Sequence, residues 1–455
     1  MGSRPPLNHS NTDSRLKTTF RALRHRNFRI FFSGQLFSLI GTWIQTVAES
    51  WLVYRLTGSS LKLGAVGFCA QIPVFIAAPI GGIIADRYDR RKIVIGTQVS
   101  AMLLALIYAA LVLIHGSDGK MLIQVWHIFL LAALLGLVNG IDIPARQSFM
   151  VEMVGKEDLM NAIALNSSMF NGARIIGPAI AGIMVGAIGE GWCFFANGIS
   201  YIAVITGLML ITVQPRVISI KSSPTQHLIA GFRFVKGAKP IRDMLLLLGV
   251  VSLVAMPYAV LMPIFADRIL HVGAEGLGIL MGATGVGALL AALSLAARSG
   301  LKGLGRLIGF AALGFGVSLI AFSSSRTFWL SVLLLVPVGF GMMLETTTSN
   351  TLIQAMVPDE LRGRVMAVYT MMFMGMAPLG SLFSGAVADR LGAPVTLSIG
   401  GVICMIAAAV FLSRLPQFRI GARELVVAQG LAGGDPAQEI ASSGMMNPPF
   451  SSEDE

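Results

Sequence analysis

The stretch Gly81–Val94, GGIIADRYDRRKIV, places six charged residues within the seven positions from Asp86 to Lys92. Long apolar runs precede and follow it. Each run is about twenty residues long, which is enough for a helix to cross the roughly 30 Å hydrocarbon core of a bilayer. The stretch therefore predicts a short polar hairpin that joins two membrane-spanning helices.

The whole chain shares this character. Its 455 residues are 55% hydrophobic and 13% charged, with a mean hydropathy of +0.75, whereas a soluble domain carries about 25% charged residues. Cys69, Cys193 and Cys404 lie far apart in apolar segments, so their spacing predicts neither a disulfide framework nor a metal site. The polar, basic N-terminus lacks the pattern of a cleavable signal peptide, so the first spanning helix is expected to direct insertion.

The apolar runs predict an all-α membrane protein with twelve transmembrane helices. The predicted helices cover residues 28–54, 61–85, 93–115, 125–147, 160–187, 192–212, 242–266, 273–297, 305–324, 328–350, 364–388 and 394–413. The longest polar connection, between the sixth and seventh helices, divides them into two six-helix halves. Within it, the segment 227–237 has the apolar and basic faces of an interfacial helix.

The distribution of basic residues predicts the orientation. With an even number of spans, both termini lie on one side, and the great majority of the 34 Lys and Arg residues lie in segments on that same side. The opposite side holds Arg55, Lys62, Lys120, Arg268, Arg326 and Arg390. The positive-inside rule therefore places both termini and the 81–94 hairpin in the cytoplasm. This distribution also accounts for the net charge of +11 without nucleic-acid binding.

These observations predict five parts of the chain. They are a basic cytoplasmic N-terminal segment at 1–27, an N-terminal half at 28–212, a cytoplasmic linker at 213–241, a C-terminal half at 242–413 and a disordered cytoplasmic tail at 414–455. The low hydrophobicity of the tail is the basis for predicting disorder.

The two halves contain an internal repeat. A shift of 203 residues aligns Asp142 with Glu345, Met153-Val154 with Met356-Val357, Glu157 with Glu360, Gly177 with Gly380, Gly182 with Gly385, and Gly189 with Gly392. One register therefore matches two intramembrane acids, a loop dipeptide and three glycines. A parallel repeat of two six-helix halves is the architecture of major facilitator transporters.

The hairpin resembles the loop signature of the major facilitator superfamily, in which a glycine and apolar residues precede Asp-Arg and a basic pair. The family pattern commonly has glycine where this chain has Asp89. Further stretches are similar to the branch that contains bacterial enterobactin exporters and macrolide efflux proteins. These stretches are WLVYRLTGSSLKLG, DIPARQSFMVEMV, NAIALNSSMFNGARIIGPAIAG and GWCFFANGIS. Drug antiporters often carry an arginine in the middle of the fourth helix, whereas the first basic residue here is Arg146, near that helix's cytoplasmic end.

This resemblance implies a conformational latch. Asp86 is expected to contact the cytoplasmic N-terminus of the eleventh helix, where helix-end amides and Arg362 or Arg364 favour an anion. The contact would hold the cytoplasmic side shut and break when the cavity opens inward. The other hairpin residues assigned to the latch are Gly82, Arg87, Arg90 and Arg91.

Polar residues inside predicted spans are candidates for coupling or for lining a cavity, because ionisable groups are costly there. Gln45, Thr46 and Glu49 share a helix face with Thr42, and we expect this face to line a central cavity. Glu49 is either a carboxylate that couples transport to protons or recognises cations, or an idle residue near the outer interface.

Four further charged residues lie in or near the predicted spans. Asp142 and Arg146 are four residues apart and can pair, and Glu345 holds the matching place in the second half. They form either a cytoplasmic gate or structural ion pairs, and we favour the structural role. Arg174 is expected to contact an anionic cargo or to neutralise a neighbouring acid.

Small residues and a proline are assigned to helix packing or bending. They are Gly172, Gly177, Pro178, Gly182, Gly380 and Gly385.

The function predicted is a secondary active exporter that moves small amphipathic molecules, drugs or siderophore-like compounds by alternating access. The chain lacks G-x-x-x-x-G-K-[ST], H-E-x-x-H and G-x-S-x-G, so neither direct use of ATP nor an enzyme is predicted. A lipid or lysolipid transporter of the same fold and a non-transporting sensor remain as alternatives. The expected partners are a small-molecule cargo, a proton gradient and membrane lipid, and we expect a monomer in a bacterial inner membrane with no cofactor or metal.

Overall fold

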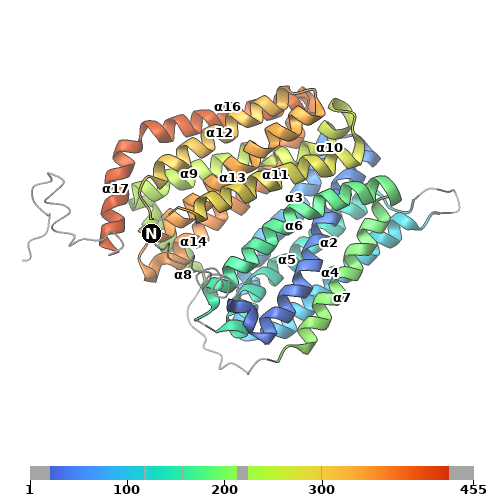
Figure 1. The fold of residues 1–455 in the computed structure, drawn as a ribbon, viewed down its shortest axis with the longest axis horizontal. Coiled ribbons are helices and arrows are strands. Elements are labelled where there is room, and N and C mark those ends of the chain that lie inside the picture. Colours follow the sequence, from blue (N-terminus) through green and yellow to red (C-terminus); the bar gives the residue numbers. More distant parts are fainter. Residues whose placement is uncertain are drawn as a thin grey trace, which may run out of the picture.

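The computed structural model describes residues 21–429, except residues 117, 118, 120, 156, 213–223 and 299. The first six spans are α2 (Arg26–Thr57), α3 (Ser60–Arg87), α4 (Arg90–Leu113), α5 (Val125–Val154), α6 (Leu159–Ile188) and α7 (Glu190–Leu210). They form the blue-to-green bundle of Figure 1, and the later spans form the yellow-to-red bundle.

Two spans of the second bundle are interrupted helices. The seventh consists of α9 (Lys239–Val254), the 3-10 turn η2 (Met256–Leu261), α10 (Met262–Ile264) and the π turn η3 (Phe265–Ile269). The eleventh consists of α14 (Asp359–Thr370), the π turn η4 (Met371–Gly375) and α15 (Met376–Leu391). The uninterrupted spans are α11 (Gly273–Ala296), α12 (Leu304–Ser324), α13 (Phe328–Met356) and α16 (Ala393–Ser413). Pro257 and Pro263 remove backbone donors within the seventh span, which explains its irregular turns.

Twelve helices in the described part of the chain are long and apolar enough to cross a membrane, which confirms the predicted fold class. Each coincides with a predicted span, and the ends differ by a few residues. The largest differences arise because α5 and α13 continue beyond their predicted ends. The 30 residues of α5 span about 45 Å, so this helix projects beyond the hydrocarbon core or is tilted within it.

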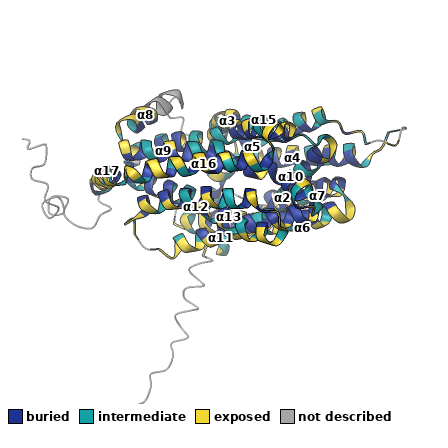
Figure 2. Cartoon of the chain, turned by 90° about the horizontal axis from the view of Figure 1, so that it is seen from above, coloured by how far each residue is buried: buried dark blue, intermediate teal, exposed yellow. Residues whose placement is uncertain are grey.

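The outer faces of these helices are apolar. Leu333, Phe383 and Ile183 are each more than 60% exposed, and exposed positions alternate with buried ones along the long helices in Figure 2. An apolar surface of this extent is rare on a soluble monomer and is normal against lipid. The chain is therefore a multi-pass membrane protein.

The internal repeat is present in the packing as well as in the sequence. Gly177 of α6 lies against Trp43 of α2, and Gly380 of α15 lies against Pro257 of the seventh span. The fifth and eleventh spans thus contact the first and seventh spans at matching positions. This agreement supports two pseudo-symmetric halves.

The C-terminal tail differs from the prediction. Residues Leu415–Ala428 form α17, whose Phe418 is buried with its ring 5.2 Å from that of Phe411. Ala422 and Val427 are also buried, so apolar residues on one helix face hold α17 against the bundle. The prediction of disorder from residue 414 is therefore wrong for this segment, and residues 430–455 lie outside the described part.

The linker contains the predicted helix, α8 (Pro224–Gly237). Its Gly231 packs directly on the backbone of Arg364 in α14, and a side chain at Gly231 would collide with that backbone. The linker helix therefore rests on the start of the eleventh span.

The segment before α2 is attached to the loop between α5 and α6. His25 Nε2 lies 2.7 Å from Asp158 Oδ2, and Arg21 pairs with the same carboxylate. The hydrogen bond from His25 and the charge of Arg21 hold the pKa of the Asp158 carboxyl below its ordinary value of 3.8. These interactions therefore stabilise the folded protein fully at a pH above 3.8. The stabilisation would be lost only as the pH falls through the lowered pKa of Asp158.

Candidate functional site at the interface of the two halves

The two halves pack closely at one end of the bundle. A methyl group added to Gly64 of α3 would lie 3.0 Å from Cα of Gly385 in α15, and one added to Gly182 of α6 would lie 3.0 Å from Cα of Gly278 in α11. Gly182 and Gly385 are repeat-related, so the two contacts are equivalent. Figure 2 shows α3 and α15 side by side. Only glycine permits backbones to approach this closely.

Polar contacts join the halves at the same end, which we call the Asp389 end. Asp389, near the last turn of α15, accepts a hydrogen bond of 3.1 Å from the Ser59 hydroxyl and a longer one of 3.5 Å from the Leu61 amide. Ser59 is the N-cap of α3. The Asp389 carboxylate therefore lies at a helix N-terminus, where amides and the helix dipole favour an anion.

A second polar cluster closes this end beside α2. The Tyr54 hydroxyl donates to Asp267 at 2.6 Å. Arg268 donates to the Gly58 carbonyl at 3.0 Å, and its guanidinium lies 5.7 Å from the centre of the Tyr54 ring. The end of the first span is thus tied to the end of the seventh.

The opposite end, which we call the Asp86 end, is open by comparison. Gly82 lies 18 residues, or five helical turns, beyond Gly64 on the same face of α3. A methyl group on Gly82 or on Gly363 of α14 would meet nothing within 4 Å. Met160 and Leu293, on the helices that meet through Gly182 and Gly278, are 76% and 57% exposed. The halves therefore approach at the Asp389 end and not at these positions of the Asp86 end.

Asp86 is 73% exposed in this arrangement and pairs with Arg90 on its own segment at 3.5 Å. The contact with α14 that the sequence predicts, near Arg362 and Arg364, would require this end to close. The latch stays a prediction.

The basic residues of the hairpin have different surroundings. Arg90 is nearly buried and bonds to Glu152 at 2.9 Å and to the Ala85 carbonyl at 3.0 Å. Arg91 donates to the carbonyls of Leu208 and Met209 at 2.7 Å. These two residues fasten the hairpin to α5 and α7 within the N-terminal half, whereas Arg87 is exposed.

The structure explains Asp89, which replaces the usual glycine of the loop. Its φ is −59°, so no glycine is required, and its side chain accepts hydrogen bonds from the amides of Arg91 at 3.0 Å and Lys92 at 3.4 Å. Asp89 is therefore the N-cap of α4.

We expect Asp89→Ala to weaken the first turn of α4 by about 1 kcal/mol, because two amides lose their acceptor. Hydrogen exchange of the α4 N-terminus should become about fivefold faster, as measured by mass spectrometry. Asp89→Asn preserves a capping oxygen and is the matched control. Equal exchange rates in the two variants would show that the cap is unimportant.

Arg174 lies in the middle of α6, facing the other half. Its side chain interacts electrostatically with Tyr258 of η2, which also lies near Thr284 of α11. Among the described residues, Arg174 Nη2 has no hydrogen-bond partner. The structure thus brings together a cation, a phenol and a hydroxyl from three spans, at mid-membrane depth and between the halves.

The Asp142–Arg146 pair is internal to the N-terminal half. Arg146 Nε lies 3.2 Å from Asp142 Oδ2, while Thr97 and Gln98 of α4 donate to Oδ1 at 2.7 and 3.0 Å. Asp142 is 2% exposed. A buried carboxylate with all these partners fits the structural role that the sequence favours.

Glu49 and Glu345 are buried carboxyl groups of a different kind, one in each half. Glu49 faces Tyr108, and its Oε1 has no hydrogen-bond partner among the described residues. Glu345 accepts a long bond of 3.4 Å from Ser349, and its Oε2 is likewise unpartnered. Neither forms an ion pair within the described part of the chain. An isolated carboxylate in an apolar interior is costly, so each site favours neutralisation by a proton or a cation.

The expectation that Gln45, Thr46 and Glu49 share one cavity-lining face needs correction. Gln45 is buried and accepts a hydrogen bond of 2.6 Å from Asn197 of α7, so it lies between two helices of the same half. Thr46 is exposed and bonds to the Thr42 carbonyl. Gln45 and Thr46 have different surroundings because adjacent residues of an α-helix point in directions about 100° apart.

The assigned small residues also differ from one another. Gly177, Gly182, Gly380 and Gly385 all make close contacts with neighbouring backbone or side-chain atoms, whereas a methyl group on Gly172 would meet nothing within 4 Å. Gly172 is therefore not a packing residue in this arrangement. Pro178 is buried within an α6 helix that continues through it.

Sequence reasoning missed Asp389, Asp267 and Tyr54. A signal for Asp389 was present, because Ala388-Asp389-Arg390 repeats the tripeptide Ala85-Asp86-Arg87 of the hairpin. Each tripeptide ends a span that packs on the other half, but at opposite ends of the bundle.

The twelve spans, the parallel repeat and the glycine contacts between the halves define a major facilitator transporter. The sequence profile described as transmembrane secretion effector matches residues 17–428, and the chain belongs to this family. It is a transporter family, and the chain is not an enzyme.

Relatives with similar sequences cover nearly the whole chain. Identity is 28% to the staphyloferrin A transporter of Staphylococcus aureus, over 86% of this chain and 98% of the relative. Identity is also 28% to the multidrug efflux pump Tap of Mycolicibacterium fortuitum, over 84% of this chain and 95% of the relative. Identity is 24% to the enterobactin exporter EntS of Shigella boydii, over 87% of this chain and 93% of the relative.

Solved structures share the fold. The nucleoside transporter NupG matches with a TM-score of 0.63 and 16% identity, over 86% of this chain and 99% of that chain. A bacterial homologue of the iron transporter ferroportin in an inward-facing state matches with a TM-score of 0.64 and 16% identity. This match covers 85% of this chain and 98% of that chain. Similarity at this level of identity supports the architecture alone.

Proposed function

We propose that the protein is a proton-driven exporter of small amphipathic molecules that carry anionic or oxygen-rich groups, with siderophore-like compounds as the preferred class. The main support is Arg174, a half-buried side chain between the halves whose buried Nη2 has no hydrogen-bond partner among the described residues. A cation held at mid-membrane depth marks a binding or coupling site by default. Compounds that chelate ferric iron present oxygen donors of the kind that a guanidinium binds.

The names of the relatives support the same class, because two of them are siderophore transporters and one is a drug efflux pump. Drugs are therefore the second candidate cargo. A protein that moves either class needs a site between the halves that opens to each side in turn.

The proposed orientation places the Asp86 end and both termini in the cytoplasm of a bacterium, with the protein in its inner membrane. The excess of basic residues at that end supports this placement. In this orientation the described arrangement is closed toward the outside and open toward the cytoplasm, ready to accept cargo from within.

Two carboxylates are proposed to alternate as latches between the halves. Asp389 holds the outer side shut through Ser59 and the N-terminus of α3. When the halves rock, this contact breaks, and Asp86 closes the cytoplasmic side against the N-terminus of α14. Arg362 or Arg364 would add a favourable charge there. Gly82 and Gly363, which have free space now, would permit close approach in that state.

Coupling to protons is assigned to Glu49 and Glu345. Each lies inside one half without a countercharge among the described residues, so gain or loss of a proton changes the electrostatic energy of that half. This differs from Asp142, whose charge is already compensated by Arg146.

The proposal is tested by comparing Arg174→Ala and Arg174→Lys with the unchanged protein in cells that secrete a siderophore. We expect Arg174→Ala to lower the amount of iron chelator in the medium at least tenfold at equal membrane expression, since the anionic group loses its partner, and Arg174→Lys to preserve part of it. A parallel drug-susceptibility panel tests the second class. Normal export of both classes by the alanine variant would remove Arg174 from the site.

A further inference from the structure

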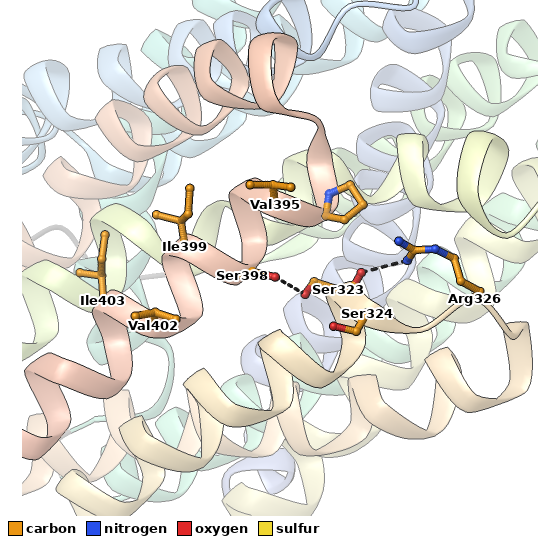
Figure 3. Close-up of a pocket in the computed structure, with 9 residues that line it drawn as sticks. Ser323, Ser324, Arg326, Val395, Ser398, Ile399, Val402 and Ile403 are labelled. Atoms are coloured by element: carbon orange, nitrogen blue, oxygen red, sulfur yellow. Dashed lines mark hydrogen bonds between the residues drawn. The ribbon is translucent and has the colours of Figure 1, made fainter.

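A groove lies on the outside of the C-terminal half, away from the interface between the halves. It has a volume of about 510 Å³ and runs between α12 and α16 at the Asp389 end (Figure 3). Its lining residues are Ser323, Ser324, Arg326, Pro394, Val395, Ser398, Ile399, Val402 and Ile403. They divide into a polar group at the end of α12 and an apolar row on α16, with Ser398 beside the polar group.

The polar end is fixed by hydrogen bonds. The hydroxyls of Ser323 and Ser398 lie 2.7 Å apart and join the two helices. Arg326 Nη1 donates to the carbonyls of Ser323 at 3.1 Å and Ser325 at 3.0 Å, which holds the guanidinium at the mouth of the groove. Within the described part of the chain, no carboxylate pairs with Arg326. The remaining guanidinium donors therefore present an uncompensated positive charge, and the exposed Ser324 hydroxyl, which donates to the Ile320 carbonyl at 3.1 Å, lies beside them.

The apolar row has the dimensions of a lipid chain in one leaflet. Val395, Ile399, Val402 and Ile403 lie on one face of α16 and are each 39–48% exposed. The eight residue steps from the first to the last cover about 12 Å, close to half of the roughly 30 Å hydrocarbon core. The same face continues through Ile406 and Val410, which are also exposed.

We propose that this groove is a phospholipid site, in which the phosphate of an anionic head group binds Arg326 and one acyl chain lies along Val395–Ile403. Arginine binds phosphate through paired N–H donors, which matches the fixed guanidinium at the mouth. The site faces the surrounding membrane and does not depend on the proposed cargo pathway. A free phosphate ion would use the polar end and leave the apolar row without a role.

The test measures lipid adducts of the purified full-length protein by native mass spectrometry, with added phosphatidylglycerol as the probe. We expect Arg326→Ala to reduce the phosphatidylglycerol adduct about fivefold, the effect of removing one arginine near an anionic lipid. Val402→Trp, which fills the groove while preserving the charge, should reduce it as well. Arg390→Ala is the matched control, because Arg390 is exposed at the same end of the bundle and does not line the groove.

An unchanged adduct in Arg326→Ala, or an equal loss in Arg390→Ala, would overturn the site. An unchanged adduct in Val402→Trp would overturn the role of the acyl chain. Inorganic phosphate is added in a separate arm, and we expect it to leave the lipid adduct intact. Displacement of the lipid by phosphate alone would assign the polar end to a free anion and contradict the proposal.

Discussion

We expect Asp389→Asn and Asp86→Asn to shift the protein in opposite directions. Loss of the Asp389 carboxylate removes its charge-assisted bond to Ser59 and its interaction with the α3 N-terminus. At an exposed position these two interactions together stabilise the closed Asp389 end by about 1 kcal/mol. The outward-open population should rise about fivefold. Loss of Asp86 removes the proposed latch of the outward-open state, so this population should fall by a similar factor and export should slow.

The measurement is the rate at which a membrane-impermeant maleimide labels Ser381→Cys, in a background with the three native cysteines replaced. Ser381 is 2% exposed because it packs on Gly64, so its labelling requires the Asp389 end to open. Arg390→Gln alters a neighbouring exposed charge and serves as the control. Shifts in the same direction for both aspartate variants would contradict the two-latch account.

The second large effect is expected from Glu49 and Glu345, the buried carboxyls that form no ion pair among the described residues. Glu49→Gln and Glu345→Gln should each reduce cargo-driven proton flux in proteoliposomes at least tenfold, because glutamine keeps the shape of the side chain and cannot carry the proton. Tenfold corresponds to about 1.4 kcal/mol of lost coupling. Cargo binding should persist, since among the described residues Glu49 interacts with Tyr108 and Glu345 with Ser349, and neither with Arg174.

Glu190→Gln is the control for this prediction. Glu190 is also buried, but Arg55 pairs with both of its oxygens at 2.9 and 3.0 Å. Its charge is compensated, so the ratio of protons to cargo should stay the same in this variant. Unchanged ratios in both the Glu49 and Glu345 variants would refute their role in coupling.

The fold was largely predictable because lipid imposes a simple rule on sequence. A helix that crosses the membrane needs about twenty apolar residues, and charged loops mark its ends. The twelve spans followed from that rule. The α17 helix did not, because Phe418, Ala422 and Val427 form a sparse amphipathic pattern in a segment of low hydrophobicity, and this pattern is stabilised only by contact with the bundle.

The site was predictable in part. Arg174 and Glu345 could be selected because an ionisable residue inside a span is costly wherever it points. Their partners could not, since the sequence does not say which helices face each other. Gln45 and Thr46 are adjacent, yet one contacts Asn197 within its own half and the other is exposed. Asp389 could have been found by comparing the two Ala-Asp-Arg tripeptides.

Distances between spin labels at the two ends of the bundle test the account most directly. One pair, at Met160 and Leu293, reports the Asp86 end, and the other, at Leu61 and Leu391, reports the Asp389 end; all four side chains are exposed. With the protein in lipid nanodiscs at high and low pH, we predict that one distance lengthens as the other shortens. Distances that both stay constant, or that change in the same direction, would contradict alternating access through these contacts.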